Sequence, residues 1–343
     1  MKANTITGNV TKLAERKRGR PMPETPQQWI DTLAEVGYFM DMSLAETVHV
    51  HWTLRDAPLL LEGEPGGGKT RLVEAIEDAL DVPLYRLQCY QGIEPSRALY
   101  AWNNQLQKVL TEFAYREHQA IPPNLVNLLY SEKTMVQGVF LKALMDPNPH
   151  TTILIDEIDK LDQEFEAVML EFLGAFKVTV AEMNKRYMPV SGKDPHIFLT
   201  SNAGIEGSSR REALSYPVLR RSRRVLIHPP TPERQWEIVC SRIPNLSPEV
   251  AEEAVLAVAY INNRLSLDKP ISISEVLMWS RRLALRMCHA LTAEVLQQTL
   301  PDIAKLDRDQ KTVIDASKAI LEYIVKLRGS LRSKSPLNPG ASI

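Results

Sequence analysis

The chain has 343 residues, of which 44% are hydrophobic and 24% charged, and its formal net charge is −1. The length suits one large domain and a smaller one, and the near-zero net charge gives no global electrostatic argument for binding nucleic acid or membrane. We find neither a run of about 18 apolar residues nor the apolar core of a signal peptide, so we expect a cytoplasmic protein without membrane contacts.

The N-terminal segment, residues 1–25, is basic and contains proline, with Arg16, Lys17, Arg18 and Arg20 close together. This composition is typical of a flexible tail. The basic residues suit a contact with nucleic acid or a partner, but a solvated tail is the favoured interpretation.

Residues 58–76, PLLLEGEPGGGKTRLVEAI, predict a buried strand, a glycine-rich loop and an amphipathic helix. Gly63, Gly68, Lys69 and Thr70 have the spacing of the P-loop motif in the strand–loop–helix context that the motif requires. Glycines let backbone N–H groups surround a polyphosphate, and the helix N-terminus adds a favourable dipole. We expect Lys69 to neutralise phosphates and Thr70 to bind Mg²⁺. The predicted nucleotide-binding residues are Gly63, Glu64, Pro65, Gly66, Gly67, Gly68, Lys69, Thr70 and Arg71.

A second strand is predicted over residues 83–90, and residues 97–145 are mostly helical in pattern. The latter segment is longer than one crossover helix needs, which indicates a helical insertion.

An apolar strand in residues 151–162 ends in Asp156 and Glu157. In an open α/β sheet, residues at the carboxyl ends of strands face the ligand crevice. We expect Asp156 to support Mg²⁺ and Glu157 to activate a water molecule for attack on the γ-phosphate. A hairpin is predicted over residues 174–192, followed by a strand whose last polar residue, Asn202, is placed to hold the attacking water.

Four arginines, Arg220, Arg221, Arg223 and Arg224, come just before another predicted strand. They suit either a basic patch for nucleic acid or an arginine finger, a cation given to a neighbouring subunit's γ-phosphate. Their place in the chain favours the finger, with Arg221 and Arg223 as equal candidates.

Prolines at 229, 230 and 232 mark a hinge, after which the pattern is helical to about residue 328. Residues 329–343 are rich in Gly, Ser and Pro and are predicted to form a second flexible tail.

With these motifs in this order, the sequence resembles an AAA+ ATPase. Within that superfamily it resembles the MoxR family, in the branch paired with von Willebrand factor A (VWA) domain proteins. The resemblance covers residues 26–290 and rests on GEPGGGKT (the Walker A loop), ILIDEIDK (the Walker B strand) and residues 85–103 and 164–183. It implies an α/β fold, an αβα sandwich with a parallel sheet followed by an all-α lid. The expected division is a tail (1–25), the nucleotide-binding domain (26–231), the lid with a helical extension (232–328) and a tail (329–343).

The family pattern carries over residue by residue. Lys69 and Thr70 match the residues that bind ATP and Mg²⁺, and Asp156 with Glu157 matches the Walker B pair. Asn202 matches sensor 1. The finger falls within Arg220–Arg224, although Ser222 stands where the family has its last arginine. Arg281 is the candidate for sensor 2, with Lys269 second.

The resemblance implies a ring-forming ATP hydrolase, a hexamer, that remodels or matures a protein complex together with a VWA-domain partner and a protein client. Two other functions stay open. One is a nucleic-acid-associated AAA+ motor of a restriction or phage-defence type, and the other is a nucleotide-gated scaffold that does not hydrolyse ATP.

Overall fold

The computed structural model describes residues 21–118, 125–202 and 214–334. They divide into two compact units. The sheet unit comprises residues 21–32, Asp41–Glu62 and the described part of Thr70–Leu226, and the helical unit comprises Leu33–Met40, Gly63–Lys69 and residues 227–334. The division therefore differs from the expected boundary at residue 231. The physical reason is that residues 33–40 and the P-loop pack with the C-terminal helices, as Gly37 does beside Ser241.

To residue 145 the elements are α2 (Pro26–Ala34), α3 (Met42–Leu54), β1 (Leu59–Gly63), α4 (Lys69–Leu80), β2 (Leu84–Gln88), β3 (Tyr100–Trp102), α5 (Asn104–His118), α6 (Leu125–Leu129), β4 (Met135–Gln137) and α7 (Val139–Met145). From residue 152 to residue 227 they are β5 (Thr152–Asp156), α8 (Gln163–Ala175), β6 (Val178–Val180), β7 (Lys185–Tyr187), β8 (His196–Ser201), α9 (Tyr216–Arg221) and β9 (Arg223–Ile227). The helical elements that follow are α10 (Pro232–Arg242), α11 (Pro248–Arg264), α12 (Ile273–Leu285), α13 (Ala293–Thr299), α14 (Asp307–Asp315), α15 (Ser317–Leu327) and α16 (Ser330–Lys334).

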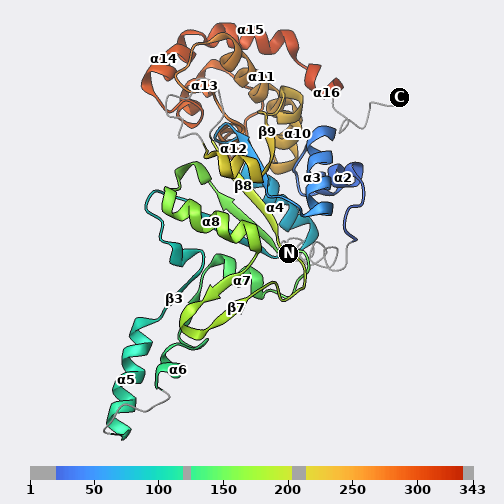
Figure 1. Cartoon of the computed structure of the whole chain (residues 1–343). Helices are drawn as coiled ribbons and strands as arrows, with labels where there is room; N and C mark the ends of the chain where they lie inside the picture. Colours follow the sequence, from blue (N-terminus) through green and yellow to red (C-terminus); the bar gives the residue numbers. More distant parts are fainter. Residues whose placement is uncertain (1–20, 119–124, 203–213, 335–343) are drawn as a thin grey trace, which may run out of the picture. The chain divides into compact units, whose positions relative to one another are not determined.

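A five-stranded parallel sheet, in the order β2–β5–β8–β1–β9, organises the sheet unit (Figure 1). Every residue of β1, β5 and β8 is buried, which explains the apolar run that each strand contains, because helices cover both faces of such a sheet. The register pairs Gln88 with Asp156 and Ile155 with Leu199. The carboxyl ends of β2, β5 and β8 therefore reach the same edge.

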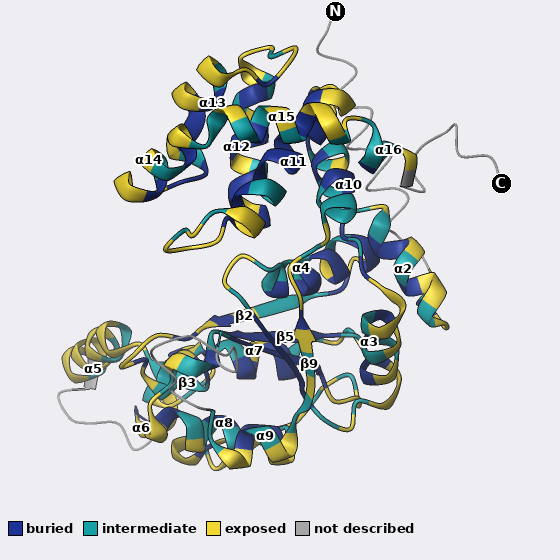
Figure 2. Ribbon diagram, turned by 90° about the horizontal axis from the view of Figure 1, so that it is seen from above, coloured by how far each residue is buried: buried dark blue, intermediate teal, exposed yellow. Residues whose placement is uncertain are grey.

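Helices lie on both faces of the sheet. Ile153 and Ile155 of β5 and Leu199 of β8 belong to one buried cluster with residues of α7 and α8. Figure 2 shows α8 on one side of the sheet and α4 on the other. This is the αβα sandwich expected from the sequence, and the fold class is confirmed.

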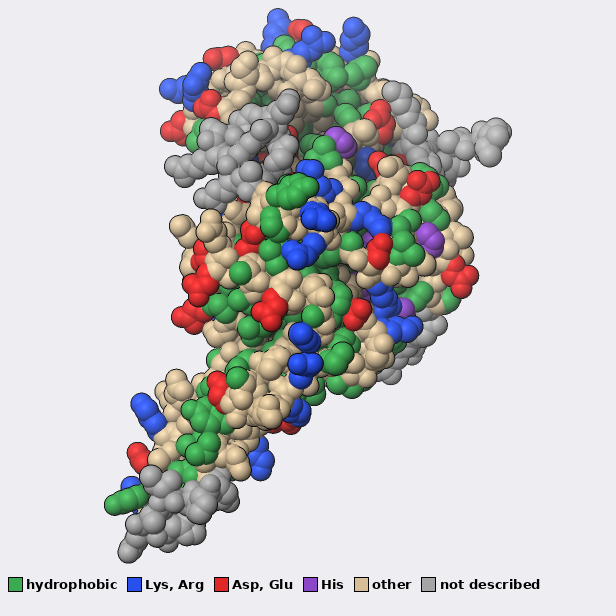
Figure 3. Space-filling view, viewed as in Figure 1, with side chains coloured by type: hydrophobic (Ala, Val, Ile, Leu, Met, Phe, Trp, Pro, Cys, Tyr) green, Lys and Arg blue, Asp and Glu red, His purple; other side chains and the backbone are tan. Residues whose placement is uncertain are grey.

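The segment between β2 and β5 builds an arm, which we define as the described residues 100–118 and 125–137. Figure 1 shows α5 and α6 of this arm projecting away from the sheet. At its base, Tyr100 Oη and Trp102 Nε1 donate to Glu182 at 3.0 and 3.1 Å, which joins the arm to the antiparallel β6–β7 hairpin. On the face drawn in Figure 3, acidic and basic side chains are interspersed along the arm.

The amino ends of the strands carry a buried aromatic group in the sheet unit. The ring of Trp52 stacks on that of His196 with a centroid distance of 3.7 Å, and His51 packs edge-on against Phe198 at 4.7 Å. Burial lowers the pKa of His51 to about 4, and burial lowers the pKa of His196 well below its usual value. Among the described residues, neither ring nitrogen of His196 has a hydrogen-bond partner. Both histidines are therefore neutral in the folded protein at pH 7.

These histidines predict a loss of stability in acid. Their folded pKa lies below the unfolded value of 6.5, so between pH 6.5 and the folded pKa the unfolded chain binds protons that the folded chain does not. For His51, with a folded pKa of about 4, stability then falls by roughly 1.4 kcal/mol between pH 7.5 and 5.5, and His196 adds a loss of the same sign. His196→Phe should keep the stack, retain stability at pH 7.5 and lose less at pH 5.5, as measured by urea unfolding at both values. His289→Gln, a change at an exposed histidine, is the control and should lose as much stability in acid as the wild type. If His196→Phe also loses as much free energy of unfolding between pH 7.5 and 5.5 as the wild type, the prediction is wrong.

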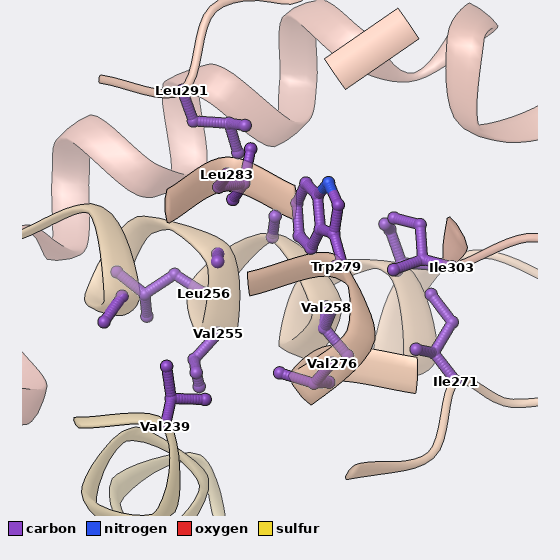
Figure 4. Packing of buried hydrophobic residues seen from close by; sticks show 14 of the residues in the cluster. Val239, Val255, Leu256, Val258, Ile271, Val276, Trp279, Leu283, Leu291 and Ile303 are labelled. Atoms are coloured by element: carbon purple, nitrogen blue, oxygen red, sulfur yellow. The ribbon is translucent and has the colours of Figure 1, made fainter. Parts of the chain in front are cut away.

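The helical unit has its own core. Trp279 of α12 is fully buried, and its Nε1 donates to Thr299 Oγ1 at 2.7 Å. Figure 4 shows Val258, Val276 and Ile303 around its ring. α12 begins at a capping box in which Ser272 and Glu275 satisfy each other's backbone N–H groups. This region is the all-α lid that the fold class requires.

The helical region continues past the expected boundary at residue 328. Residues 330–334, placed in a flexible tail by composition, form α16. The physical reason is Glu252 of α11, which is 0% exposed. Its carboxylate accepts from Gly329 N and Leu331 N, each at 2.9 Å, and from Arg332 Nε at 2.9 Å. The tail predicted over residues 1–25 lies mostly outside the described residues, as does the end of the chain from residue 335.

We call the hydrogen bonds of Glu252 with residues 329–332 the C-terminal clasp. We expect that ending the chain after Arg328 destabilises the helical unit by about 3–5 kcal/mol, because the buried carboxylate then loses its donors. Glu252→Met in the shortened chain should recover much of this loss, since no charge is then left unpaired. Urea unfolding of both proteins measures the difference, and a chain ended after Lys334 is the control. If Glu252→Met lowers the free energy of unfolding of the shortened chain further, the loss on shortening does not come from the unpaired carboxylate.

In the part of the chain that the structure describes, no helix is long and apolar enough to cross a membrane.

Candidate active site

The loop between β1 and α4 has the backbone of a phosphate cradle. Gly66 and Gly68 adopt φ values of +79° and +94°, a region that favours glycine. Gly67 N donates to Glu64 O at 3.1 Å, which closes the turn. Lys69 is buried, and its Nζ donates to Gly63 O and Glu64 O, each at 2.9 Å. The ammonium group therefore lies within the loop that the sequence assigned to phosphate.

Within the helical unit, this loop lies against the start of α12. A Cβ atom on Gly66 would lie 2.7 Å from Ser272 Oγ and 3.5 Å from Ser274 Oγ, so only glycine fits. Ser274 and Arg281 are seven residues apart on α12 and share a helical face. Arg281, the sensor 2 candidate, is exposed on the face of α12 that starts beside Gly66.

Asp156 is the buried carboxylate at the end of β5, and it is 3% exposed. Its Oδ1 accepts from Thr70 Oγ1 at 3.0 Å and from Thr200 Oγ1 at 2.5 Å. Its Oδ2 accepts from the Arg86 guanidinium. The two residues predicted to hold Mg²⁺ are thus brought together, one from α4 and one from β5.

Glu157 follows in a left-handed conformation, with φ 61° and ψ 50°, which few residues without special support adopt. Its N–H donates to Thr200 Oγ1 at 2.8 Å, and this bond holds the turn. Its Oε2 accepts from Gln88 Nε2 at 3.0 Å and from Lys160 Nζ at 2.5 Å. The hydrogen bond to Glu157 raises the pKa of Lys160. The carboxylate is therefore held beside the end of β5 by two donors.

Asn202 lies just beyond β8, and its backbone N–H donates to Asp159 Oδ1 at 3.1 Å. This places the sensor 1 candidate next to the turn that carries Glu157.

The thiol of Cys89, which comes directly after β2, is buried near these carboxylates. Burial is the main cause that raises its pKa to about 12, and the charges of Asp156, Asp159 and Glu157 add to it. It is therefore not a thiolate.

Five residues of this network were not singled out from the sequence: Arg86, Gln88, Asp159, Lys160 and Thr200. Arg86 and Gln88 alternate with apolar residues along β2, and Thr200 lies inside an apolar strand. Polar residues near the carboxyl ends of parallel strands indicate a site at that edge of the sheet, and this is the sequence signal by which they could have been found. Which carboxylate each would contact depended on the strand order, because β2 is the neighbour of β5 only in the folded sheet.

The structure separates the arginine candidates. Arg223 Nη2 donates to both carboxylate oxygens of Asp56 at 3.1 Å, and Arg224 donates to the buried Glu62 at 2.8 and 2.6 Å. Arg221 is exposed at the C-terminal end of α9. Arg71, expected near the nucleotide, donates to Asp78 on its own helix at 2.9 Å. Arg220 is exposed as well, so of the two favoured candidates, Arg221 and Arg223, Arg221 is the exposed one and Arg223 is held by Asp56.

Residues 58–221 match the family model of the AAA domain, dynein-related subfamily. This part of the chain is therefore similar to the AAA domains of that subfamily. The match extends from the start of β1 to the end of α9 and so includes the P-loop, Asp156, Asn202 and Arg221. An AAA+ domain implies nucleotide binding and, in general, ATPase activity, and such domains commonly assemble into rings. A search among curated proteins found no match to the chain.

Proposed function

We propose that the protein is a ring-forming MoxR-type AAA+ ATPase that hydrolyses ATP and uses the energy to remodel or mature a protein complex with a VWA-domain partner. The observation that carries the ATPase is the cluster at the end of β5, where Asp156 meets the Thr70 hydroxyl at 3.0 Å and Glu157 follows in a constrained turn. A hydroxyl and a carboxylate are oxygen ligands of the kind that Mg²⁺ prefers. The donor set therefore fits the expected metal.

In this mechanism the N–H groups of the P-loop and Lys69 would bind the β- and γ-phosphates, and Thr70 with Asp156 would hold Mg²⁺, which when bound would neutralise charge on the phosphates. Glu157 orients the attacking water and accepts its proton, and Asn202 positions the same water. Arg281 on α12 and Arg221 from a neighbouring subunit complete the charges around the γ-phosphate.

Features of the sheet unit support the finer assignment. The arm lies between β2 and β5 and the β6–β7 hairpin lies before β8, which are the places that the resemblance assigns to the helical insertion and the hairpin of the family. Val109, Phe113 and Val126 of the arm are 47%, 62% and 60% exposed. Apolar surface of this kind suits a protein partner or client better than nucleic acid. Pairing of Arg223 and Arg224 with carboxylates also leaves less basic surface for a nucleic-acid motor.

Lys69→Ala tests the nucleotide site. We expect ATP affinity to fall by about a hundredfold, because the phosphates lose a charged donor that lies within the loop. Isothermal titration calorimetry measures the affinity, and phosphate release from ATP by the wild type measures turnover. Lys326→Ala, an exposed lysine of α15, is the matched control. Wild-type protein that releases no phosphate, or a Lys69→Ala variant that binds as the wild type does, would contradict the proposal.

A further inference from the structure

Asp156 has no unoccupied carboxylate oxygen. Thr70 and Thr200 donate to Oδ1, and Arg86 donates to Oδ2. The two hydroxyls are neutral, so among these donors the charge on this buried carboxylate is balanced by Arg86 alone. The side chain of Asp156 is 4% exposed and that of Arg86 is 44% exposed. The cation therefore reaches the carboxylate from the solvent side.

Arg86 also touches two other acceptors within the sheet unit. Its Nη2 donates to Gln88 Oε1 at 3.1 Å, and its Nη1 lies 3.6 Å from Glu74 of α4. Gln88 in turn donates to Glu157 at 3.0 Å. A small movement of the guanidinium toward Glu74 would free Asp156 and would also remove a donor from the Gln88 amide that holds Glu157.

A guanidinium and a divalent cation cannot share Asp156 without a cost. Both need the same buried carboxylate, and like charges a few ångströms apart repel strongly where solvent is scarce. Without either cation, the buried carboxylate is left uncompensated. Arg86 and a metal ion are therefore alternatives at this position.

We propose that Arg86 is a positioning residue that guards the metal ligand Asp156. It balances the carboxylate before nucleotide arrives, and it moves to Glu74 when Asp156 and Thr70 take up the divalent cation of the metal–nucleotide complex. This inference rests on the proposed function of the site. It adds that affinity for the metal is set by competition with Arg86.

The experiment measures how strongly nucleotide binding depends on metal. ADP is titrated calorimetrically into the full chain, once with EDTA and once with excess Mg²⁺. The ratio of the dissociation constant in EDTA to that in Mg²⁺ is then compared among variants. Arg86→Met keeps the side chain long but removes the charge, and we expect the ratio to rise by about tenfold or more. Arg86→Lys keeps a competing cation, so its ratio should stay near that of the wild type. Arg186→Met, an exposed arginine of β7, is the matched control.

Thermal melting provides a second readout. Arg86→Met should lower the melting temperature of the metal-free protein, because Asp156 loses its counter-ion, and this deficit should shrink with Mg²⁺ and ADP. A purely structural role would lower both melting temperatures equally. An Arg86→Met ratio at or below the wild-type value overturns the proposal. Failure of the wild type to bind ADP even in excess Mg²⁺ would instead overturn the nucleotide site, and this inference with it.

Discussion

Replacing Glu157 by glutamine is expected to lower ATP turnover by about 10²–10⁴-fold while ATP binding stays close to that of the wild type. The amide keeps the size of the side chain and can still accept from Gln88 and Lys160, but it cannot take a proton from water. Phosphate release measures turnover, and calorimetry with ATP measures binding. ATP held in the site should also favour the assembled ring, which light scattering detects.

Glu164→Gln is the matched control, since Glu164 is an exposed glutamate at the start of α8. A Glu157→Gln variant that hydrolyses ATP at the normal rate would remove Glu157 from catalysis. One that fails to bind ATP would show that Glu157 supports the turn at φ 61° rather than the reaction.

Arg221→Ala is expected to lower turnover by about 10³–10⁵-fold without weakening ATP binding by a single subunit, because a finger acts on the γ-phosphate of its neighbour. The same change at Arg223 should have a much smaller effect. Arg223 is paired with Asp56 in its own sheet unit, and breaking a partly exposed pair costs about 1 kcal/mol or less of stability. Steady-state phosphate release by the two variants decides between the candidates.

Mixing two inactive variants tests whether Arg221 acts between subunits. In a ring containing Arg221→Ala and Lys69→Ala subunits, some interfaces pair an intact P-loop with an intact arginine, so activity should partly return. Mixing Arg221→Ala with Glu157→Gln should also restore activity. Mixing Arg221→Ala with Arg221→Lys is the control: neither variant supplies the arginine, so the turnover of the mixture should not exceed the sum of the turnovers of the two variants. If mixed rings form and activity stays absent, Arg221 does not act in trans.

The order of motifs along the chain was enough to predict the class of fold. Buried parallel strands are covered on both faces, so β1, β5 and β8 each contain a short apolar run, and these runs predict the three strands from the sequence. The P-loop could be located as well, because glycine spacing, Lys69 and Thr70 form a contiguous motif whose chemistry depends on local backbone geometry. Local patterns of this kind also located the capping box at Ser272.

Contacts between distant segments were decided only by the tertiary structure. The sequence pattern places Arg86 in a strand without indicating its partner, and it makes Arg223 and Arg221 equal candidates for the arginine finger. The strand order places Arg86 on Asp156, 70 residues away, and Arg223 on Asp56, 167 residues away. The C-terminal segment is a similar case, since its composition is that of a flexible tail, yet Glu252, more than 70 residues earlier, holds Gly329, Leu331 and Arg332. Ion pairs and hydrogen bonds of this kind leave no periodic trace in a sequence, because each needs only one residue at each end and a fold that brings the two together.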